Sequence, residues 1–477
     1  MVRAADDRIH AAAPRAERRI ARVFRPLLRT PLALLAVLEL LVLAAVPALA
    51  RWLLGEPYAA ATWPASTTCA AAGVIALCAM GLYSRRQRSR LEGVLLRVAA
   101  ALLAAGAGIA LLSYLLPPLA LARPVFLLTG PLSFLLLALD RFLFERVVDE
   151  DVFRRRVLVY GAGRRAISVT QLRRRSDTRG FRVVGFVATE GDELLVPGER
   201  LVEPPGTLLP YCRRHDVDEI VVAMDDRRTA FPIHDLLECR LAGVTVTELV
   251  DFLESETGKV RLDVLNPSWI IFSAGFSRTP LRQLTGRLLD IVASAALLAL
   301  AWPLMLLAMI AVKIEDGWRA PVFYSQVRVG LEGLHFEVLK FRSMRVDAEQ
   351  VGAPMWATPG DPRMTRVGAV MRKLRIDELP QLLNVLLGDM RFVGPRPERP
   401  EFVRELEDRI PYYRERHTAK PGITGWAQLC YAYGASAEDA AEKLQYDLYH
   451  VKNHSLLFDL MILLQTVEVV LWGKGAR

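Results

Sequence analysis

Long apolar runs dominate the first third of the chain. They lie at residues 31–53, 65–83, 94–116 and 124–144. Each run approaches the ~20 residues that a helix needs to cross the hydrocarbon core of a bilayer. The pattern therefore predicts a domain of four transmembrane helices at residues 30–146, preceded by a basic tail at residues 1–29.

Arginine residues indicate how this membrane domain is oriented. The tail, the loop 85–90 and the segment 154–156 are basic, whereas the loops 56–64 and 117–123 carry little charge. Cytoplasmic loops of membrane proteins are enriched in Lys and Arg. We therefore expect both the tail and the end of the fourth helix to face the cytoplasm.

After residue 156 the pattern changes to short β-branched runs that alternate with polar helical segments. Residues 157–159 are typical of a strand, and Gly161-Ala162-Gly163 follows as the turn before a helix. Further strands are expected at residues 182–187, 219–223 and 244–247. This order predicts a cytoplasmic Rossmann-like domain with a parallel sheet at residues 152–255, followed by a linker at 256–284.

The glycine turn is a weak indication of a bound dinucleotide. Turns that bind dinucleotides are accompanied by an acid about twenty residues further along the chain. Glu190, near the end of the second predicted strand, is the only candidate for that acid. We therefore favour a structural or regulatory role for the sheet domain over cofactor binding.

The apolar stretch 288–312 is as long as a membrane span but carries Pro303 at its middle. Basic residues flank it at both ends, namely Arg282, Arg287, Lys313 and Arg319. A span would place these cytoplasmic signals on opposite faces of the membrane. We therefore predict a re-entrant helix that enters one leaflet, breaks at Pro303 and returns, because proline interrupts helical hydrogen bonding. A kinked full span is the alternative.

Composition narrows the possible partners. The chain has 477 residues, of which 52% are hydrophobic, so it has room for two or three domains and is too apolar to be purely soluble. Its net charge of +9 suits nucleic acid, anionic lipid or phosphorylated substrates. The membrane segments favour lipid headgroups, and we expect no nucleic-acid partner. The five cysteines and seven histidines form no zinc-type spacing, so zinc is not expected.

Two adjacent acids, Asp377 and Glu378, lie between the arginine-bearing stretches 372–375 and 394–397. Adjacent carboxylates can divide their work, because one can attack or hold a metal ion while the other helps to bind it. Arginines neutralise a diphosphate, and prolines hold them in a stiff turn. A solvated acid pair near a helix start is the structural alternative. Together with the apolar segment before it, this pattern favours phosphate chemistry at a membrane surface.

The strings of the last third, in their order, resemble the bacterial sugar transferase family of polyprenyl glycosylphosphotransferases. They are Lys340-Phe341-Arg342-Ser343-Met344, the acid pair, Gly394-Pro395-Arg396-Pro397 and Lys420-Pro421-Gly422-Ile423-Thr424-Gly425-Trp426. The layout is similar to the large monotopic phosphoglycosyl transferases, in particular the exosortase-associated exopolysaccharide branch. The resemblance implies an α-rich catalytic domain at residues 285–477, and thus an α/β membrane protein with three parts.

The resemblance implies transfer of a sugar 1-phosphate from a UDP-sugar to polyprenyl (undecaprenyl) phosphate. UMP would be released, and the product would begin assembly of an exopolysaccharide or O-antigen-like glycan at the bacterial inner membrane. Asp377 would be the covalent nucleophile, and Asp377 and Glu378 together would hold Mg²⁺. Four basic residues would bind substrate, namely Arg372, Arg396, Lys340 and Arg342.

Structural alternatives remain for several of these basic residues. Arg396 could be a surface arginine in a stiff turn, and Lys340 or Arg342 could anchor the chain at the lipid interface. Arg375 occupies a position where the family often has a small polar residue, so its role stays open. The motifs do not indicate which sugar is transferred.

Two other functions fit parts of the sequence. A nicotinamide-dependent enzyme could modify nucleotide sugars at the glycine turn, with the C-terminal region as its membrane tether. A noncatalytic scaffold could recruit a polysaccharide machine, although the density of charged groups around the acid pair argues against it. The expected partners of the transferase are a UDP-sugar, polyprenyl phosphate and the lipid bilayer, and the large Rossmann-like domain offers surface for a homodimer.

Overall fold

The computed structural model describes residues 31–472 apart from 57–62, 84–90, 117–120, 148–153, 173–174, 179, 205, 227–230, 266, 274, 277–278, 346–362, 432–433 and 435. The chain divides into two compact units, Met1–Leu249 and Val250–Arg477. The predicted basic tail at 1–29 and the basic loop at 85–90 lie outside the described residues.

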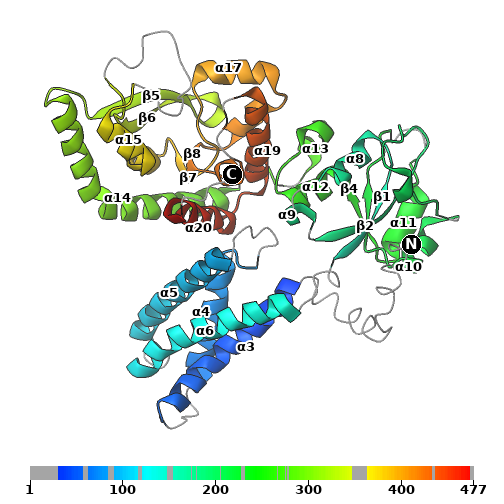
Figure 1. Ribbon diagram of the computed structural model, residues 1–477, viewed down its shortest axis with the longest axis horizontal. Coiled ribbons are helices and arrows are strands. Elements are labelled where there is room, and N and C mark those ends of the chain that lie inside the picture. The colour runs from blue at the N-terminus through cyan, green and yellow to red at the C-terminus, as the bar shows by residue number, and fades with distance from the viewer. Residues whose placement is uncertain are drawn as a thin grey trace, which may run out of the picture. The chain divides into compact units, whose positions relative to one another are not determined.

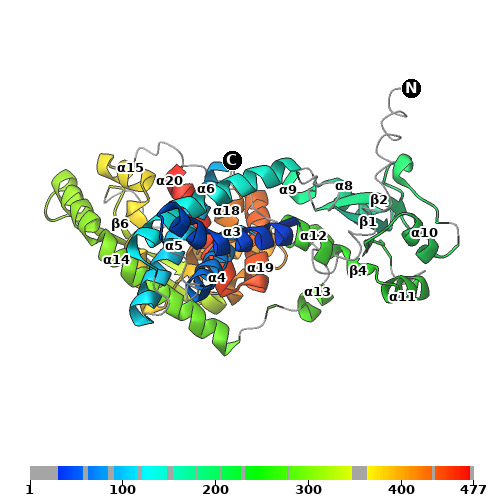
Figure 2. The same cartoon turned by 90° about the horizontal axis from the view of Figure 1, so that it is seen from below.

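The four predicted apolar stretches all form helices. They are α3 (Pro31–Leu53), α4 (Trp63–Ala79), α5 (Leu91–Leu115) and α6 (Arg123–Val147). They lie side by side as a bundle (Figures 1 and 2), with α3 packed against both α4 and α6. Helices α3, α5 and α6 are long and apolar enough to cross a membrane, whereas α4 is shorter at 17 residues.

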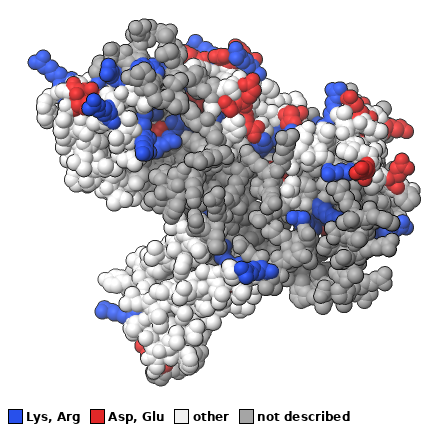
Figure 3. Space-filling view, viewed as in Figure 1, with Lys and Arg blue, Asp and Glu red and all other residues white. Residues whose placement is uncertain are grey.

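The bundle buries a small core and exposes a largely uncharged surface. Leu43, Leu77 and Leu137 are buried between the helices. Large apolar side chains such as Leu103 and Leu127 point outward, where 76% and 72% of their surfaces are exposed. Figure 3 shows few charged side chains on this bundle. An apolar outer surface of this kind is what a lipid environment requires.

An ion pair lies inside the bundle. Arg141 on α6 donates from Nε to Glu39 Oε1 at 2.6 Å and from Nη2 to Oε2 at 3.0 Å. Tyr83 also donates to Glu39, whose side chain is fully buried. Charged groups at membrane depth are costly unless they are paired. These bonds therefore fix α3 against α6.

The sheet domain contains four parallel strands in the order β2-β1-β3-β4, which confirms the predicted parallel sheet. The strands are β1 (Arg155–Tyr160), β2 (Phe181–Val187), β3 (Glu219–Val222) and β4 (Thr245–Glu248). The connecting helices are α8 (Arg164–Thr170), α9 (Arg175–Thr178), α10 (Leu208–Arg214) and α11 (Ile233–Leu241), with a 3-10 turn, η3, at Gly198–Arg200. Leu158, Ile220 and Cys239 lie in its core.

The C-terminal unit begins within α12 (Leu249–Thr257). Then follow η4 (Leu262–Val264) and α13 (Pro267–Phe272), which lie within the predicted linker 256–284. Residues here bond to the far end of the chain, because Trp426 Nε1 donates to Gly258 O at 2.8 Å and Val260 N donates to Gln445 O at 2.9 Å. This segment is therefore packed against residues near the C-terminal end of the chain.

The predicted membrane-inserted segment lies in α14 (Pro280–Asp316), a 37-residue helix with Pro303 inside it. Figure 1 shows α14 as two legs that meet at a bend. Large apolar side chains such as Leu300 and Trp302 are exposed. The helix thus presents an apolar surface outward and packs a narrow face against the rest of the unit. The buried residues of that face are mostly small or polar: Gly286, Asp290, Ser294, Ala301, Ala308 and Val312.

The remaining elements of the C-terminal unit are helices, short strands and turns. They are β5 (Phe323–Val329), η5 (Leu331–Gly333), β6 (His335–Phe341), α15 (Arg366–Lys373), η6 (Ile376–Glu378), α16 (Gln381–Leu387), β7 (Arg391–Val393), α17 (Pro400–Arg409), η7 (Tyr413–Thr418), β8 (Gly422–Thr424), α18 (Trp426–Cys430), α19 (Ala437–Asn453) and α20 (Leu456–Trp472). Strands β5 and β6 form an antiparallel hairpin, and β7 pairs with β8 in parallel.

Candidate active site

The acid pair lies on η6, a single turn between two helices. Arg375 precedes this turn in the left-handed conformation, with φ of 59° and ψ of 19°. Pro380 follows it and caps α16. The left-handed residue reverses the chain at the end of α15, and the proline starts the next helix at once. Asp377 and Glu378 are therefore held on a short, constrained segment.

Helix α16 fixes this segment to strand β6. Asn384 Nδ2 donates to Glu337 O at 2.8 Å, and Leu339 N donates to Asn384 Oδ1 at 3.0 Å. The Asn384 side chain thus continues the hydrogen-bond pattern of the strand edge. These bonds keep the acid pair beside Lys340, the next residue of β6.

Helix α14 supports the same segment from both of its legs. Near its start, Arg287 donates to Val385 O at 2.5 Å and to Leu386 O at 2.6 Å, at the open carbonyl end of α16. Near its end, Ala308 and Val312 share a core with Ile376. Ile376 and α16, on either side of the acid pair, therefore contact the same helix that carries the exposed apolar surface.

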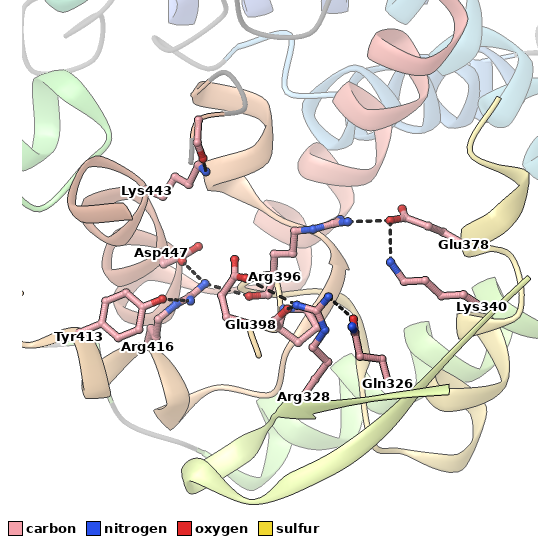
Figure 4. Close-up of polar contacts among 12 residues, drawn as sticks. Gln326, Arg328, Lys340, Glu378, Arg396, Glu398, Tyr413, Arg416, Lys443 and Asp447 are labelled. Atoms are coloured by element: carbon pink, nitrogen blue, oxygen red, sulfur yellow. Dashed lines mark hydrogen bonds and ion pairs between the residues drawn. The ribbon is translucent and has the colours of Figure 1, made fainter. Parts of the chain in front are cut away.

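Glu378 is surrounded by positive charge. Arg396 Nη2 donates to Glu378 Oε1 at 2.7 Å, and Lys340 Nζ lies 3.5 Å from the same oxygen. Arg375 Nη1 lies 3.4 Å from Oε2. Figure 4 shows Arg396 and Lys340 converging on this carboxylate. Burial raises the pKa of Glu378, but Arg396, Lys340 and Arg375 outweigh burial and hold the pKa well below its usual range. Glu378 is thus ionised at neutral pH.

Asp377 has a different environment. Only 7% of its surface is exposed, and burial raises its pKa. The negative charge of Glu378 raises the pKa further, while Lys340 and Arg372 oppose this effect. Two neighbouring carboxylates with pKa values shifted in opposite directions are typical of acids with separate roles.

A basic pocket opens beside the acid pair. Three of its side chains are cationic and come from β5, β6 and the Pro395–Pro397 turn. Burial lowers the pKa of Lys340 to about 8, and the charges of Arg396 and Arg328 add to this effect against the attraction of Glu378. Side chains with this charge suit an anionic group such as a phosphate. The lining residues are Arg328, Val338, Lys340, Gln381, Arg396, Pro397 and Gly422.

Arg328 is a pocket residue that the sequence analysis missed. It donates to Gln326 Oε1 at 2.5 Å and to Pro397 O at 3.1 Å (Figure 4). In the β5–β6 hairpin, Gln326 pairs with Val338 and Arg328 lies two residues further along, on the face shared with Lys340. The alternation of Gln326 and Arg328 along this strand was therefore a signal in the sequence that could have placed Arg328 near Lys340.

The backbone of the turn that carries Arg396 is bonded to a buried arginine, Arg416. Arg416 Nη2 donates to Arg396 O at 3.0 Å and to Asp447 Oδ2 at 2.7 Å. Arg416 Nη1 also donates to Tyr413 OH at 2.8 Å. Arg416 and Asp447 are both buried. The pair therefore positions the backbone of Arg396, and sequence analysis did not identify Arg416.

Two other predicted substrate-binding arginines lie outside the pocket lining. Arg372 Nε donates to Ser343 Oγ at 2.9 Å. The charge of Arg372 still opposes the rise in the pKa of Asp377. Arg342 is buried and donates to Asp316 Oδ2 at 2.8 Å, at the end of α14. The Nε and Nη1 atoms of Arg342 are buried without a partner in the part of the chain that the structure describes.

Four of the six predicted site residues therefore come together. Lys340 and Arg396 line the pocket and contact Glu378, which follows Asp377 in the chain. Arg372 and Arg342 instead bond to neighbouring elements.

The donor set of this site is compatible with Mg²⁺. Within the described residues, no group of three or more His, Cys, Asp or Glu side chains could hold a metal ion. Mg²⁺ usually needs only one or two carboxylates, because water and substrate phosphates complete its coordination. Asp377 and the ionised Glu378 supply such carboxylates beside a basic pocket.

Comparison with known proteins decides the family. Residues 281–473 match the family described as Bacterial sugar transferase. The chain is 33% identical over 342 residues to a UDP-glucose:undecaprenyl-phosphate glucose-1-phosphate transferase of Xanthomonas campestris pv. campestris, a match that covers 67% of each chain. The chain belongs to the bacterial sugar transferase family. This is a family of transferases. Four helices of the described residues, α3, α5, α6 and α14, are long and apolar enough to cross a membrane, and the chain is a membrane protein.

Other relatives match different shares of this chain. A UDP-N-acetylgalactosamine-undecaprenyl-phosphate N-acetylgalactosaminephosphotransferase of Aeromonas hydrophila is 42% identical over 242 residues, which are 51% of this chain and 56% of the relative. The chain thus spans little more than half the length of that protein. An uncharacterized sugar transferase of Bacillus subtilis (strain 168) is 42% identical over 195 residues, which are 40% of this chain and 89% of the relative. Residues 78–240 match a family described as CoA-binding domain.

Proposed function

We propose that this sugar transferase moves a sugar 1-phosphate from a UDP-sugar to polyprenyl phosphate through a covalent intermediate on Asp377. The observation that carries the proposal is the pairing of buried Asp377 with Glu378, which is ionised and held by Arg396 and Lys340 at a basic pocket. The names of the Xanthomonas and Aeromonas relatives, which combine a UDP-sugar with undecaprenyl phosphate, support these substrates.

The reaction proceeds in two displacements at one phosphorus atom. First, a carboxylate oxygen of Asp377 bonds to the sugar-bearing phosphorus, and the bond from that phosphorus to the bridging oxygen breaks, so that UMP leaves. Then a phosphate oxygen of polyprenyl phosphate attacks the same phosphorus, and Asp377 leaves as a carboxylate. The product is a polyprenyl diphosphate sugar. The covalent intermediate divides one difficult displacement into two easier ones, and Asp377 reacts in both.

The basic side chains bind and orient the donor. Lys340, Arg396 and Arg328 line the pocket, and they would bind the diphosphate as charge-assisted hydrogen-bond donors. Glu378 holds Arg396 and Lys340 in place before the donor arrives. Asp377 and Glu378 would hold Mg²⁺, which when bound neutralises developing charge on the diphosphate.

We also propose that the site lies at the cytoplasmic boundary of the bacterial inner membrane. Helix α14 would enter and leave the same leaflet, because its outer surface is apolar while basic residues flank both ends. The acid pair lies between Ile376 and α16, which both contact α14. It would then meet a lipid phosphate at the membrane surface and a nucleotide sugar from the cytoplasm. The product would begin an exopolysaccharide or O-antigen-like glycan.

A direct assay tests this function. Membranes containing the protein are supplied with a panel of UDP-sugars, polyprenyl phosphate and Mg²⁺, and UMP release is measured for the wild type, Asp377→Asn and the control Asp408→Asn on exposed α17. We expect Asp377→Asn to lose about 10³-fold or more of the rate, as loss of a covalent nucleophile does. Asp408→Asn should match the wild type. Activity that survives in Asp377→Asn contradicts the proposal.

Trapping the intermediate gives a second test. With labelled donor and no polyprenyl phosphate, the wild type should carry the label on the peptide that contains Asp377, identified by mass spectrometry. Addition of polyprenyl phosphate should then discharge the label. Turnover without any adduct on this peptide would instead indicate direct transfer between the two substrates.

A further inference from the structure

The glycine turn of the sheet domain lies where related folds bind a nucleotide diphosphate. Gly161-Ala162-Gly163 joins β1 to α8, and the CoA-binding domain match includes this turn. In dinucleotide-binding folds, backbone N–H groups at such a turn and at the start of its helix point at the ligand phosphates. A bound diphosphate would therefore need these N–H groups to be open.

The first two N–H groups of α8 already bond to a side chain of the same domain. Arg164 N donates to Asp225 Oδ2 at 2.8 Å, and Arg165 N donates to Asp225 Oδ1 at 2.8 Å. Asp225 lies just beyond the end of β3. Its carboxylate presents two oxygens to two adjacent amides, which is how a phosphate group would bind. The donors that usually remain open at a helix start are thus satisfied.

A second acid closes the turn itself. Asp192 Oδ2 accepts hydrogen bonds from Ala162 N at 2.9 Å, Thr189 N at 3.0 Å and Thr189 Oγ1 at 2.7 Å. Leu195 N in turn donates to Ala162 O at 3.1 Å. The segment after β2 is therefore bonded across the turn. Asp192, and not the predicted Glu190, is the acid that reaches this place.

The two glycines are explained by contacts within the domain. A Cβ atom on Gly163 would lie 1.9 Å from Asp225 Oδ2. A Cβ atom on Gly161 would lie 2.5 Å from Ala223 O, and Gly161 has a φ of 128°, which residues with a side chain rarely adopt. Both glycines thus make room for the end of β3. The motif needs no ligand to account for it.

We propose that the turn is a closed, self-capped anion site, in which Asp225 and Asp192 take the N–H groups that a nucleotide diphosphate would need. The residues present do not fit CoA or a dinucleotide. A phosphate approaching the turn would find these N–H groups already bonded. It would also meet two carboxylates, and like charges at close range repel. The sheet domain therefore has a structural role at this edge and binds no nucleotide there.

Ligand binding by the full-length protein tests this proposal. The protein in lipid nanodiscs is dialysed against labelled CoA and, separately, labelled NAD⁺. We expect no saturable binding that depends on the glycine turn. The Arg396→Ala variant identifies any CoA or NAD⁺ that binds in the basic pocket of the C-terminal unit, because only that binding should be lost. Saturable binding that persists in Arg396→Ala and disappears in Gly163→Asp would overturn the proposal.

Amide exchange tests the self-cap directly. Hydrogen exchange of a peptide that covers residues 161–168 is compared for the wild type, Asp225→Asn and the exposed control Glu238→Gln on α11. In Asp225→Asn, the new carboxamide presents an NH₂ group to one of the two backbone amides, so that one acceptor is lost. We therefore expect exchange in this peptide to be about tenfold faster in Asp225→Asn only.

A peptide from β3 reports whether the domain stays folded in these variants. Its exchange should be the same in all three proteins. Unchanged exchange of the 161–168 peptide in Asp225→Asn, or slower exchange in the wild type on addition of CoA, would contradict the proposal.

Discussion

At the scale of single residues, the charge of Lys340 should set a pH limit on the proposed binding of the donor. Its lowered pKa of about 8 means that the ammonium group loses its proton, and its charge, as the pH rises through that value. The limit applies to the free enzyme, which kcat/KM reports. We therefore expect kcat/KM for the UDP-sugar to fall about tenfold as the pH rises from about 7 to about 9.5, because a charge-assisted bond is lost. Steady-state kinetics across this range measure the fall.

The Lys340→Arg variant is the control for this prediction. Arginine stays protonated throughout the range. Its kcat/KM should therefore stay level up to about pH 9.5, even if its value at pH 7 is lower. A fall near pH 8 that is unchanged in Lys340→Arg would assign the limit to another group.

Arg328 should contribute to donor affinity rather than to the chemical step. It lines the pocket but lies apart from the contacts of Glu378. Arg328→Ala is expected to raise KM for the UDP-sugar by roughly 10- to 100-fold, with a small change in kcat, which is the loss of about one charged hydrogen bond. Arg404→Ala, on the exposed face of α17, is the matched control. An unchanged KM in Arg328→Ala would remove this residue from the donor site.

At the scale of elements, the path of α14 decides on which side of the membrane the acid pair lies. Gln283 and Arg319 flank the apolar stretch and are exposed. In a Cys78→Ser background, Gln283→Cys and Arg319→Cys should both react with a membrane-impermeant thiol reagent in inside-out vesicles and remain unlabelled in right-side-out vesicles. A full span would expose the two thiols on opposite faces, so opposite labelling would refute the re-entrant path.

Helix α14 is tied to β7 and α20 through Arg391. This guanidinium lies 3.2 Å from Asp290 Oδ2 and 3.2 Å from Asp459 Oδ2, and His450 Nε2 lies 3.0 Å from Asp459 Oδ1. Arg391→Met would leave two buried carboxylates without their cation. We expect a loss of about 3–5 kcal/mol in stability, measured as a lower midpoint of unfolding in detergent.

The surface arginine Arg409 provides the comparison. Its ion pair with Glu405 is exposed, and exposed pairs contribute about 0–1 kcal/mol. Arg409→Met should therefore leave the unfolding midpoint nearly unchanged. Equal effects of the two substitutions would mean that the Arg391 contacts do not hold α14, β7 and α20 together.

At the scale of the whole molecule, the C-terminal unit contains every residue of the proposed site. The Bacillus relative, of which this chain covers 89% with 195 residues, is little more than this region. We expect a fragment of residues 250–477 to release UMP from the donor within about tenfold of the full-length rate, and to depend on Asp377. A fragment that is folded by tryptophan fluorescence yet inactive would show that the N-terminal unit takes part in catalysis.

The sequence alone determined the features that depend on local pattern. Apolar runs identify α3, α5 and α6 because membrane insertion depends on hydropathy summed over one segment. Short β-branched runs predicted the strands of the parallel sheet for a similar reason. Motif order was enough to place Asp377 and Glu378 in a sugar transferase.

Only the tertiary structure decided which side chains meet. The motif Lys340-Phe341-Arg342-Ser343-Met344 places Lys340 and Arg342 together in the sequence. In the structure, β6 ends at Phe341 and Arg342 pairs with Asp316. Arg328 instead joins Lys340 through the register of the hairpin. The glycine turn is closed by Asp225, which lies 61 residues after Arg164 in the chain. Strand register and packing bring distant residues together, and neither is recorded in the spacing of a local motif.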